Sequence, residues 1–126
     1  MANITQKFTF DATSGKAIGT HRLGTLPIGA VIRQAYIDVE TTATSATDAA
    51  TIALGYTGAT GAFDAAIAIS DGSNPWDAGA PRVSVGAADG AVGNYIVLSA
   101  SVDVVAVVAV EALTAGVVEV VVEYEV

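Results

Sequence analysis

The chain has 126 residues, no cysteine and a formal charge of −8 at pH 7. This length fits one domain with a core large enough to be stable without disulfides. The charge argues against a nucleic-acid-binding protein, which needs a basic face to neutralise phosphates. The longest apolar run, Val104 to Val110, is far too short to cross a membrane. The first residues also lack the basic segment and apolar run of a secretory signal, so we expect neither export nor membrane insertion.

The first third of the chain predicts three strands separated by turns. Ile4, Phe8 and Phe10 alternate with polar residues, which indicates a strand with an aromatic inner face; residues 1–15 form this strand or an N-terminal arm. A second strand is expected over Ala17 to Leu23. After the tight Leu26–Gly29 connection, Val31 to Thr42 alternates over a longer stretch.

The middle of the chain predicts shorter strands joined by polar connections. The expected strands are Ala50 to Tyr56, Ala65 to Ile69, Arg82 to Val85 and Tyr95 to Ala100. The glycine-rich segment Gly55 to Gly61 predicts a flexible loop. The alanine-rich segment Phe63 to Ile69 leaves a helical turn open as an alternative to a strand.

The last quarter of the chain gives the clearest pattern. From Val118 to Val126, apolar residues alternate with positions that are mostly glutamate, as in a strand with one buried and one wet face. Leu113–Gly116 is expected to be the turn before it. Val102 to Ala112 is apolar on both faces, so we expect a central strand covered on both sides, either by the fold or by a partner. Together these patterns predict an all-β fold, an antiparallel β-sandwich of jelly-roll type with about eight strands, as a single domain over residues 1–126.

The residues needed for catalysis or metal binding are scarce. His21 is the only histidine, and no nucleophile motif or phosphate-binding loop accompanies it, so we expect no enzyme and no cofactor. Zinc is disfavoured because one histidine and no cysteine cannot supply its usual ligands. Asp71 to Asp77 contains carboxylates that suit calcium, but a turn in which Asp and Asn bond their own backbone explains the segment better.

Charge is distributed unevenly along the chain. In residues 1–63 four cations balance four acids, whereas residues 64–126 hold nine acids and one cation, Arg82. This asymmetry suggests that the N-terminal Lys7, Lys16 and Arg22 contact a partner while the C-terminal glutamates face solvent. An acidic surface kept for solubility is an equally good explanation. Trp76 is expected to pin its loop onto the sandwich, with docking into a neighbouring subunit as the alternative.

Three segments resemble a known protein family. Leu23–Ile32 leads into a strand ending in Ile37-Asp38-Val39, and Ala50–Gly55 is followed by Ala66–Gly79. With the valine-rich C-terminal strands, these segments resemble small jelly-roll proteins of tailed bacteriophages, especially cyanobacterial and marine phages, that act as capsid decoration (cement) proteins. The resemblance extends over most of residues 20–126, and the family defines no catalytic residues.

The resemblance implies a structural role in the virion. Such proteins are commonly homotrimers on the outer capsid surface, where they bridge copies of the major capsid protein; they are made in the host cytoplasm. Possible capsid or subunit contacts in this chain are Lys7, Lys16, Arg22 and Trp76. Two alternatives stay open: another virion component, such as a head-fibre base or tail-associated protein, and a carbohydrate-binding jelly roll. The second would need several exposed aromatic side chains on one face.

Overall fold

The computed structural model describes residues 2–79, 81–84 and 95–126, and these residues form strands and connections without any helix. No helix in this part of the chain is long and apolar enough to cross a membrane. The strands are β1 (Asn3–Asp11), β2 (Gly19–Leu26), β3 (Val31–Ser45), β4 (Thr51–Tyr56), β5 (Ala59–Ala68), β6 (Arg82–Val83), β7 (Ile96–Val97), β8 (Val102–Ala109) and β9 (Leu113–Glu125).

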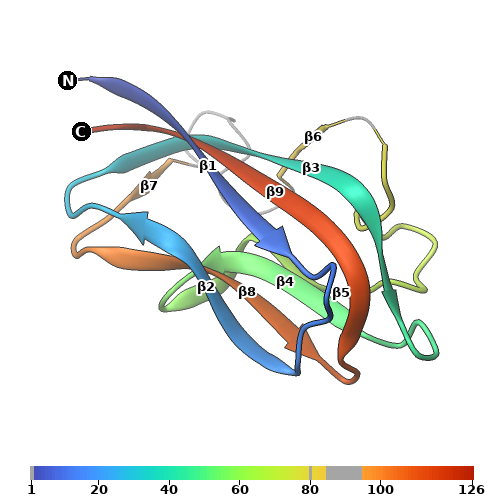
Figure 1. Ribbon diagram of the computed structural model, residues 1–126. Helices are drawn as coiled ribbons and strands as arrows, with labels where there is room; N and C mark the ends of the chain where they lie inside the picture. Colours follow the sequence, from blue (N-terminus) through green and yellow to red (C-terminus); the bar gives the residue numbers. More distant parts are fainter. Residues whose placement is uncertain (1, 80, 85–94) are drawn as a thin grey trace.

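The strands form two antiparallel sheets packed face to face (Figure 1). Sheet A has the order β1-β9-β3-β6, with β7 also paired to β3, and sheet B has the order β2-β8-β4-β5. The two short strands β6 and β7 follow one another along the same edge of β3: Val83 pairs with Tyr36, and Ile96 pairs with Ile32. They therefore occupy one strand position, which gives eight positions in all. This order is that of a jelly roll, so the predicted fold class is confirmed.

The core lies between the two sheets and follows the period-two pattern of the sequence. Phe8 and Phe10 of β1 point inward, as do Val118, Val120 and Val122 of β9. Sheet B supplies the alternating residues of β4 and β8 to the same core. One close approach explains a glycine in β2: a Cβ atom on Gly24 would lie 2.5 Å from the ring of Phe8. A larger residue at position 24 would therefore force the two sheets apart.

Several predicted boundaries were wrong, and each error has a local cause. Gly55 to Gly61 forms no loop: Gly55 lies in β4, Gly61 lies in β5, and Thr57-Gly58 makes the tight turn between them. The Phe63 to Ile69 segment lies mostly in β5 and forms no helical turn. Leu113–Gly116 is already part of β9, and Gly116 permits a close approach, because a Cβ atom there would lie 2.9 Å from the Ala43 Cα. The preceding strand ends at Ala109, three residues before the expected Ala112.

Two other strand predictions were too long. The Arg82 to Val85 strand ends at Val83, with Val85 outside the described residues, and Tyr95 to Ala100 shrinks to Ile96–Val97. In contrast, Val102 to Ala109 is a central strand of sheet B, as predicted. Its inner side chains lie in the core, and its outward Val105 is also buried, with 4% of the residue exposed.

Candidate functional site

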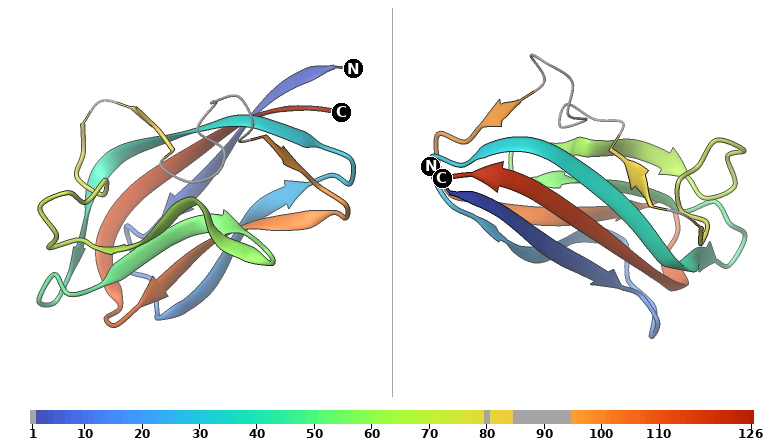
Figure 2. Two further views of the ribbon diagram at one scale, coloured as in Figure 1. Left: turned by 180° about the vertical axis from the view of Figure 1, so that it is seen from behind. Right: turned by 90° about the horizontal axis from the view of Figure 1, so that it is seen from above.

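The outer face of sheet A gathers five of the twelve acidic side chains of the described residues. It is built from β1, β9 and β3, which lie side by side in the right panel of Figure 2. The outward acids of this face are Asp38, Glu40, Glu119, Glu123 and Glu125. Register brings the carboxylates together, because Asp38 pairs with Glu119 across the β3–β9 boundary. We call this surface the acidic face.

Two cations from the first half of the chain lie on the acidic face. Lys7 Nζ is 3.4 Å from Glu119 Oε2, and the Glu119 side chain is only 11% exposed. Arg33 forms an ion pair with Glu125, and its guanidinium lies 5.1 Å from the centre of the Tyr95 ring. Repulsion from the Glu119 carboxylate raises the pKa of Glu40, and Lys7 opposes this shift. Bonding to Glu125 raises the pKa of the Arg33 guanidinium. The acidic face is thus a crowded set of charges that is only partly neutralised.

The outer face of sheet B is apolar and made of small residues. Its outward positions on the two central strands are Thr51, Ala53 and Gly55 of β4 and Asp103, Val105, Val107 and Ala109 of β8. Ala53 and Val105 are buried, yet neither belongs to the core cluster between the sheets. A Cβ atom on Gly55 would lie 2.3 Å from the Ala59 carbonyl oxygen, so the start of β5 covers the face there, while Val107 and Ala109 stay half-buried. We call it the apolar face.

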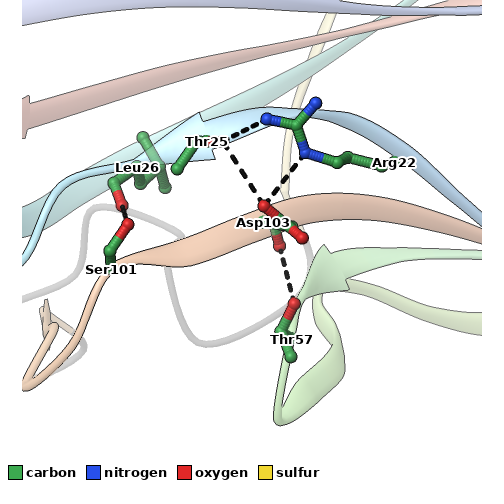
Figure 3. A network of polar contacts seen from close by, with 6 residues as sticks. All are labelled: Arg22, Thr25, Leu26, Thr57, Ser101 and Asp103. Carbon is green, nitrogen blue, oxygen red and sulfur yellow. Dashed lines mark hydrogen bonds and ion pairs between the residues drawn. The ribbon is translucent and has the colours of Figure 1, made fainter.

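One polar network crosses the apolar face near the end that carries the chain termini (Figure 3). Arg22 Nε donates to Asp103 Oδ1 at 3.0 Å, and Arg22 Nη2 donates to the Thr25 hydroxyl at 2.6 Å. On the other side of β8, the Thr57 N–H donates to the Asp103 carbonyl at 2.9 Å. Since Arg22 and Asp103 neutralise each other, this face has little net charge.

A second polar network joins the β8–β9 turn to the β3–β4 connection. The Glu111 carboxylate accepts hydrogen bonds from the Ser45 hydroxyl at 2.6 Å, from the Thr47 N–H at 2.8 Å and from the Thr47 hydroxyl at 2.7 Å. The Ala49 N–H adds a longer bond of 3.4 Å. These donors, the Ser45 hydroxyl foremost, lower the pKa of Glu111 to about 2. Glu111 is therefore a structural acid that ties two turns together.

The structure separates the predicted contact residues. Lys7 lies on the acidic face, Arg22 lies on the apolar face, and Lys16 lies between them in the β1–β2 connection. The Trp76 side chain is fully buried and its Nε1 donates to the Ile67 carbonyl at 3.2 Å, so its indole does not reach the surface of this chain. Its loop is tied to β3, because Ala43 N–H donates to the Trp76 carbonyl at 3.0 Å.

The expected division between a cationic N-terminal part and an acidic C-terminal part was wrong. β1, which carries Lys7, pairs with the acidic β9 along its whole length. Each ion pair among the described residues joins a first-half cation to a second-half acid. The jelly roll interleaves the two halves of the chain, so the charge asymmetry of the sequence does not mark two ends of the molecule.

His21 and Asp71, which the sequence offered as candidates for catalysis and metal binding, each make contacts within their own part of the fold. His21 Nε2 lies 2.7 Å from the Ala17 carbonyl, and the His21 ring packs on Phe10 with 5.7 Å between ring centres. Asp71 Oδ1 accepts bonds from the Ser73 N–H and hydroxyl, which lower the pKa of Asp71 and make the turn that we expected. Over the described ranges, no cluster of His, Asp or Glu side chains is arranged to hold a metal ion.

A concavity of about 510 Å³ lies where β1, β3 and β9 meet near the chain termini, with Asn3, Thr5, Arg33, Tyr95 and Glu123 among its lining. Its lining is mixed in charge, and sequence reasoning missed it because its residues come from four distant segments. Aromatic side chains do not gather on one face: Phe8, Phe10, Phe63 and Trp76 are buried.

Comparison with known proteins shows the same fold in three bacteriophage capsid structures. No family model matches the sequence, and no curated protein matches it. A chain in the acidic stable capsid structure of Helicobacter pylori bacteriophage KHP30 superposes with a TM-score of 0.68 and 16% identity, over 98% of this chain and 87% of that one. A chain in the capsid of Ralstonia phage GP4 gives 0.67 and 21%, over 98% and 83%. A chain in the cyanophage Pam1 capsid asymmetric unit gives 0.64 and 21%, over 97% and 83%.

Proposed function

We propose that this chain is a non-enzymatic structural protein of a phage virion that binds the outer surface of the head and cements contacts between major capsid protein subunits. The observation that carries the proposal is the match to chains of three phage capsids over nearly the whole domain. The match also fills 83% to 87% of those chains, so in those capsids this fold makes up most of a separate small chain. That arrangement suits an accessory subunit added to a shell.

A cement protein needs contact surface and no chemistry. If it binds only the assembled shell, its binding free energy adds to the stability of that shell, because rupture must also break the added contacts. The domain suits this role mechanically. Its antiparallel sheets join distant parts of the chain, and β1 and β9 are paired from Asn3–Glu125 to Asp11–Val117.

We further propose that the protein acts as a homotrimer whose copies meet through the apolar face. The acidic face carries five outward carboxylates and would repel a second copy of itself. The apolar face has one ion pair, which is internally neutralised, and small side chains that allow close approach. Burial of such a face in an oligomer is favourable because it removes apolar surface from water.

The decisive experiment uses virions of the phage that encodes the chain. Purified heads are treated with increasing urea, and released proteins are separated from intact shells by sedimentation and identified by mass spectrometry. We expect this protein to leave before the major capsid protein, and the depleted heads to rupture at lower temperature than untreated heads. Adding the purified protein back should restore the original rupture temperature. Absence of the protein from heads, or unchanged rupture after its release, would contradict the cement role.

A further inference from the structure

The turn between β8 and β9 holds a bulky aliphatic residue in an unfavourable backbone conformation. The Glu111 N–H donates to the Ala109 carbonyl at 2.8 Å, which closes a three-residue γ-turn. Val110 at its centre has a φ of 71°. The positive-φ form of this turn is rare and strained, and a β-branched side chain increases the strain. Asp48 also has positive φ, but aspartate tolerates that region better.

Packing of the Val110 side chain does not offset this strain within the chain. The side chain is 69% exposed, so it gains little from burial. The turn is held from both sides instead: Glu111 bonds to the β3–β4 connection, and Leu113 exchanges two backbone hydrogen bonds with Lys16. Strain that the surroundings impose in this way is characteristic of functional positions. The result is an exposed valine on a backbone that is held from both sides.

The β8–β9 turn and the β1–β2 connection lie at the end of the sandwich away from the termini (Figure 1). Lys16 pairs with Leu113 and Gly19 pairs with Val108, so Ile18 flanks the turn; its side chain is 57% exposed. Lys7, Arg22 and Arg33 each form an ion pair. Of the lysines and arginines whose side chains the structure describes, Lys16 alone forms no ion pair. We call Lys16, Ile18 and Val110 the Val110 tip.

We propose that the Val110 tip is the part of the domain that seats on the shell, with Val110 and Ile18 in an apolar recess and Lys16 against carboxylates at its border. This inference rests on the proposed cement function and adds which end of the domain faces the capsid. A residue whose backbone is already held, and whose side chain is short and β-branched, loses little conformational entropy on binding, which makes Val110 a suitable anchor. Lys16 acts electrostatically on Asp11 but forms no ion pair with it, and it supplies attraction to acidic groups that the rest of this acidic protein would repel.

The opposite end of the domain supplies a matched control. Val97 is also 69% exposed and is the same residue type. It lies in β7, paired with Val31, and has no positive φ. Arg33 follows two residues after Val31, the partner of Val97, and it is already paired with Glu125. The exposed fraction is thus equal at positions 97 and 110, and the positive φ and a neighbouring cation without an ion pair distinguish position 110.

The test measures rebinding to heads from which the native protein has been stripped by urea. Wild-type protein, Val110→Asp and Val97→Asp are added at equal concentration, and bound copies are quantified after sedimentation. Aspartate accepts positive φ, so Val110→Asp should fold. We expect Val110→Asp to reduce bound copies at least about tenfold, the effect of losing one interface anchor. Val97→Asp should bind within about twofold of wild type. Equal binding by Val110→Asp and wild type would overturn the inference.

A second variant separates a binding role from a structural one. Val110→Gly removes the strained side chain, and glycine favours positive φ, so the melting temperature should rise by about 2–4 °C. Although Val110→Gly should be more stable than the wild type, it should bind stripped heads more weakly. If Val110→Gly lowered both the melting temperature and binding, the valine would be structural and the inference would be wrong.

Two more outcomes distinguish this inference from the function on which it rests. If wild-type protein itself fails to rebind heads, the proposed function fails, whatever the variants do. If wild type and Val110→Asp bind heads equally but light scattering shows that Val110→Asp has lost an oligomer, the tip joins copies of this chain and the inference is overturned. Lys16→Gln adds a charge test: wild-type binding should weaken with salt, and the variant's binding should depend less on salt.

Discussion

The two outer faces of the sandwich differ more than the two halves of the sequence do. The acidic face gathers Asp38, Glu40 and three C-terminal glutamates around two paired cations. The apolar face presents alanine, glycine and valine with the Arg22–Asp103 pair. Both faces alternate with the same core, so neither pattern is needed to form the fold. The two faces therefore differ in how much it would cost to bury each of them against a partner.

The largest expected effect comes from placing the same charge on the two faces. Val107 and Val121 are both half-buried, both point outward, and both lie on strands with neighbours on either side. If the apolar face joins copies, Val107→Lys buries an unpaired charge there and weakens association by about 3 kcal/mol or more, roughly 100-fold in the dissociation constant. Val121→Lys places a cation opposite Lys7 but between Glu119 and Glu123 on the acidic face, and it should leave the oligomer intact. Light scattering over a dilution series measures both.

A trimer that survives Val107→Lys but dissociates with Val121→Lys would reverse the roles of the two faces. Equal effects would show that the contrast between the faces does not determine association. Thermal melts of both variants exclude loss of fold as the cause, because a folded variant keeps a single cooperative transition.

The second prediction concerns an acid that belongs to neither face. The Glu111 pKa of about 2 lies below its ordinary value of 4.5, so its stabilisation is present above pH 4.5 and is lost as the pH falls toward 2. Glu111→Gln should therefore lower the melting temperature at pH 7 and flatten its decline between pH 4.5 and 2. Glu123→Gln, on the acidic face and without a bonded clamp, is the matched control. A decline as steep in Glu111→Gln as in wild type would show that other carboxylates cause it.

The third prediction tests the neutralisation of the acidic face. Lys7→Glu replaces the partner of Glu119 with another carboxylate beside Asp38 and Glu40, and should cost about 1 kcal/mol of unfolding free energy. Reversing the pair with Lys7→Glu and Glu119→Lys should recover part of that loss. Urea unfolding of the single and double variants gives the coupling free energy between Lys7 and Glu119. If the free-energy changes of the two single variants simply add in the double variant, the 3.4 Å ion pair contributes nothing to stability.

The inward and outward positions of single strands could be predicted from the sequence, because alternation is a local property. In β9, Val118, Val120, Val122 and Tyr124 point inward as the pattern indicated. Pairing between strands is not local. Nothing near Lys7 in the sequence indicates that Glu119 will lie beside it, and the charge interpretation failed for that reason.

The wrongly predicted turn at Leu113–Gly116 also shows that contacts with distant residues can outweigh local sequence preference. Glycine there favoured a turn, yet the chain reverses at Val110, a residue with poor local preference for it. The reversal is held by bonds from Glu111 to residues 62 to 66 positions earlier. The Val110 tip and the concavity near the termini could not be predicted, because each combines distant segments.

The smallest expected effect is on the ion pair of the apolar face. Arg22 and Asp103 have side chains that are 63% and 45% exposed, so in the isolated chain their pair should contribute only about 0.2–1 kcal/mol, and less in high salt. In an oligomer that buries this face, removing one partner leaves a charge without water or counterion and costs more. Arg22→Gln should therefore change urea unfolding of dilute, dissociated protein little, yet weaken association measurably. The double variant Arg22→Gln, Asp103→Asn should associate nearly as wild type does. Equal effects of Arg22→Gln on unfolding and on association would mean that the pair stays in water when copies meet, and the apolar face would then lose its role as the contact between them.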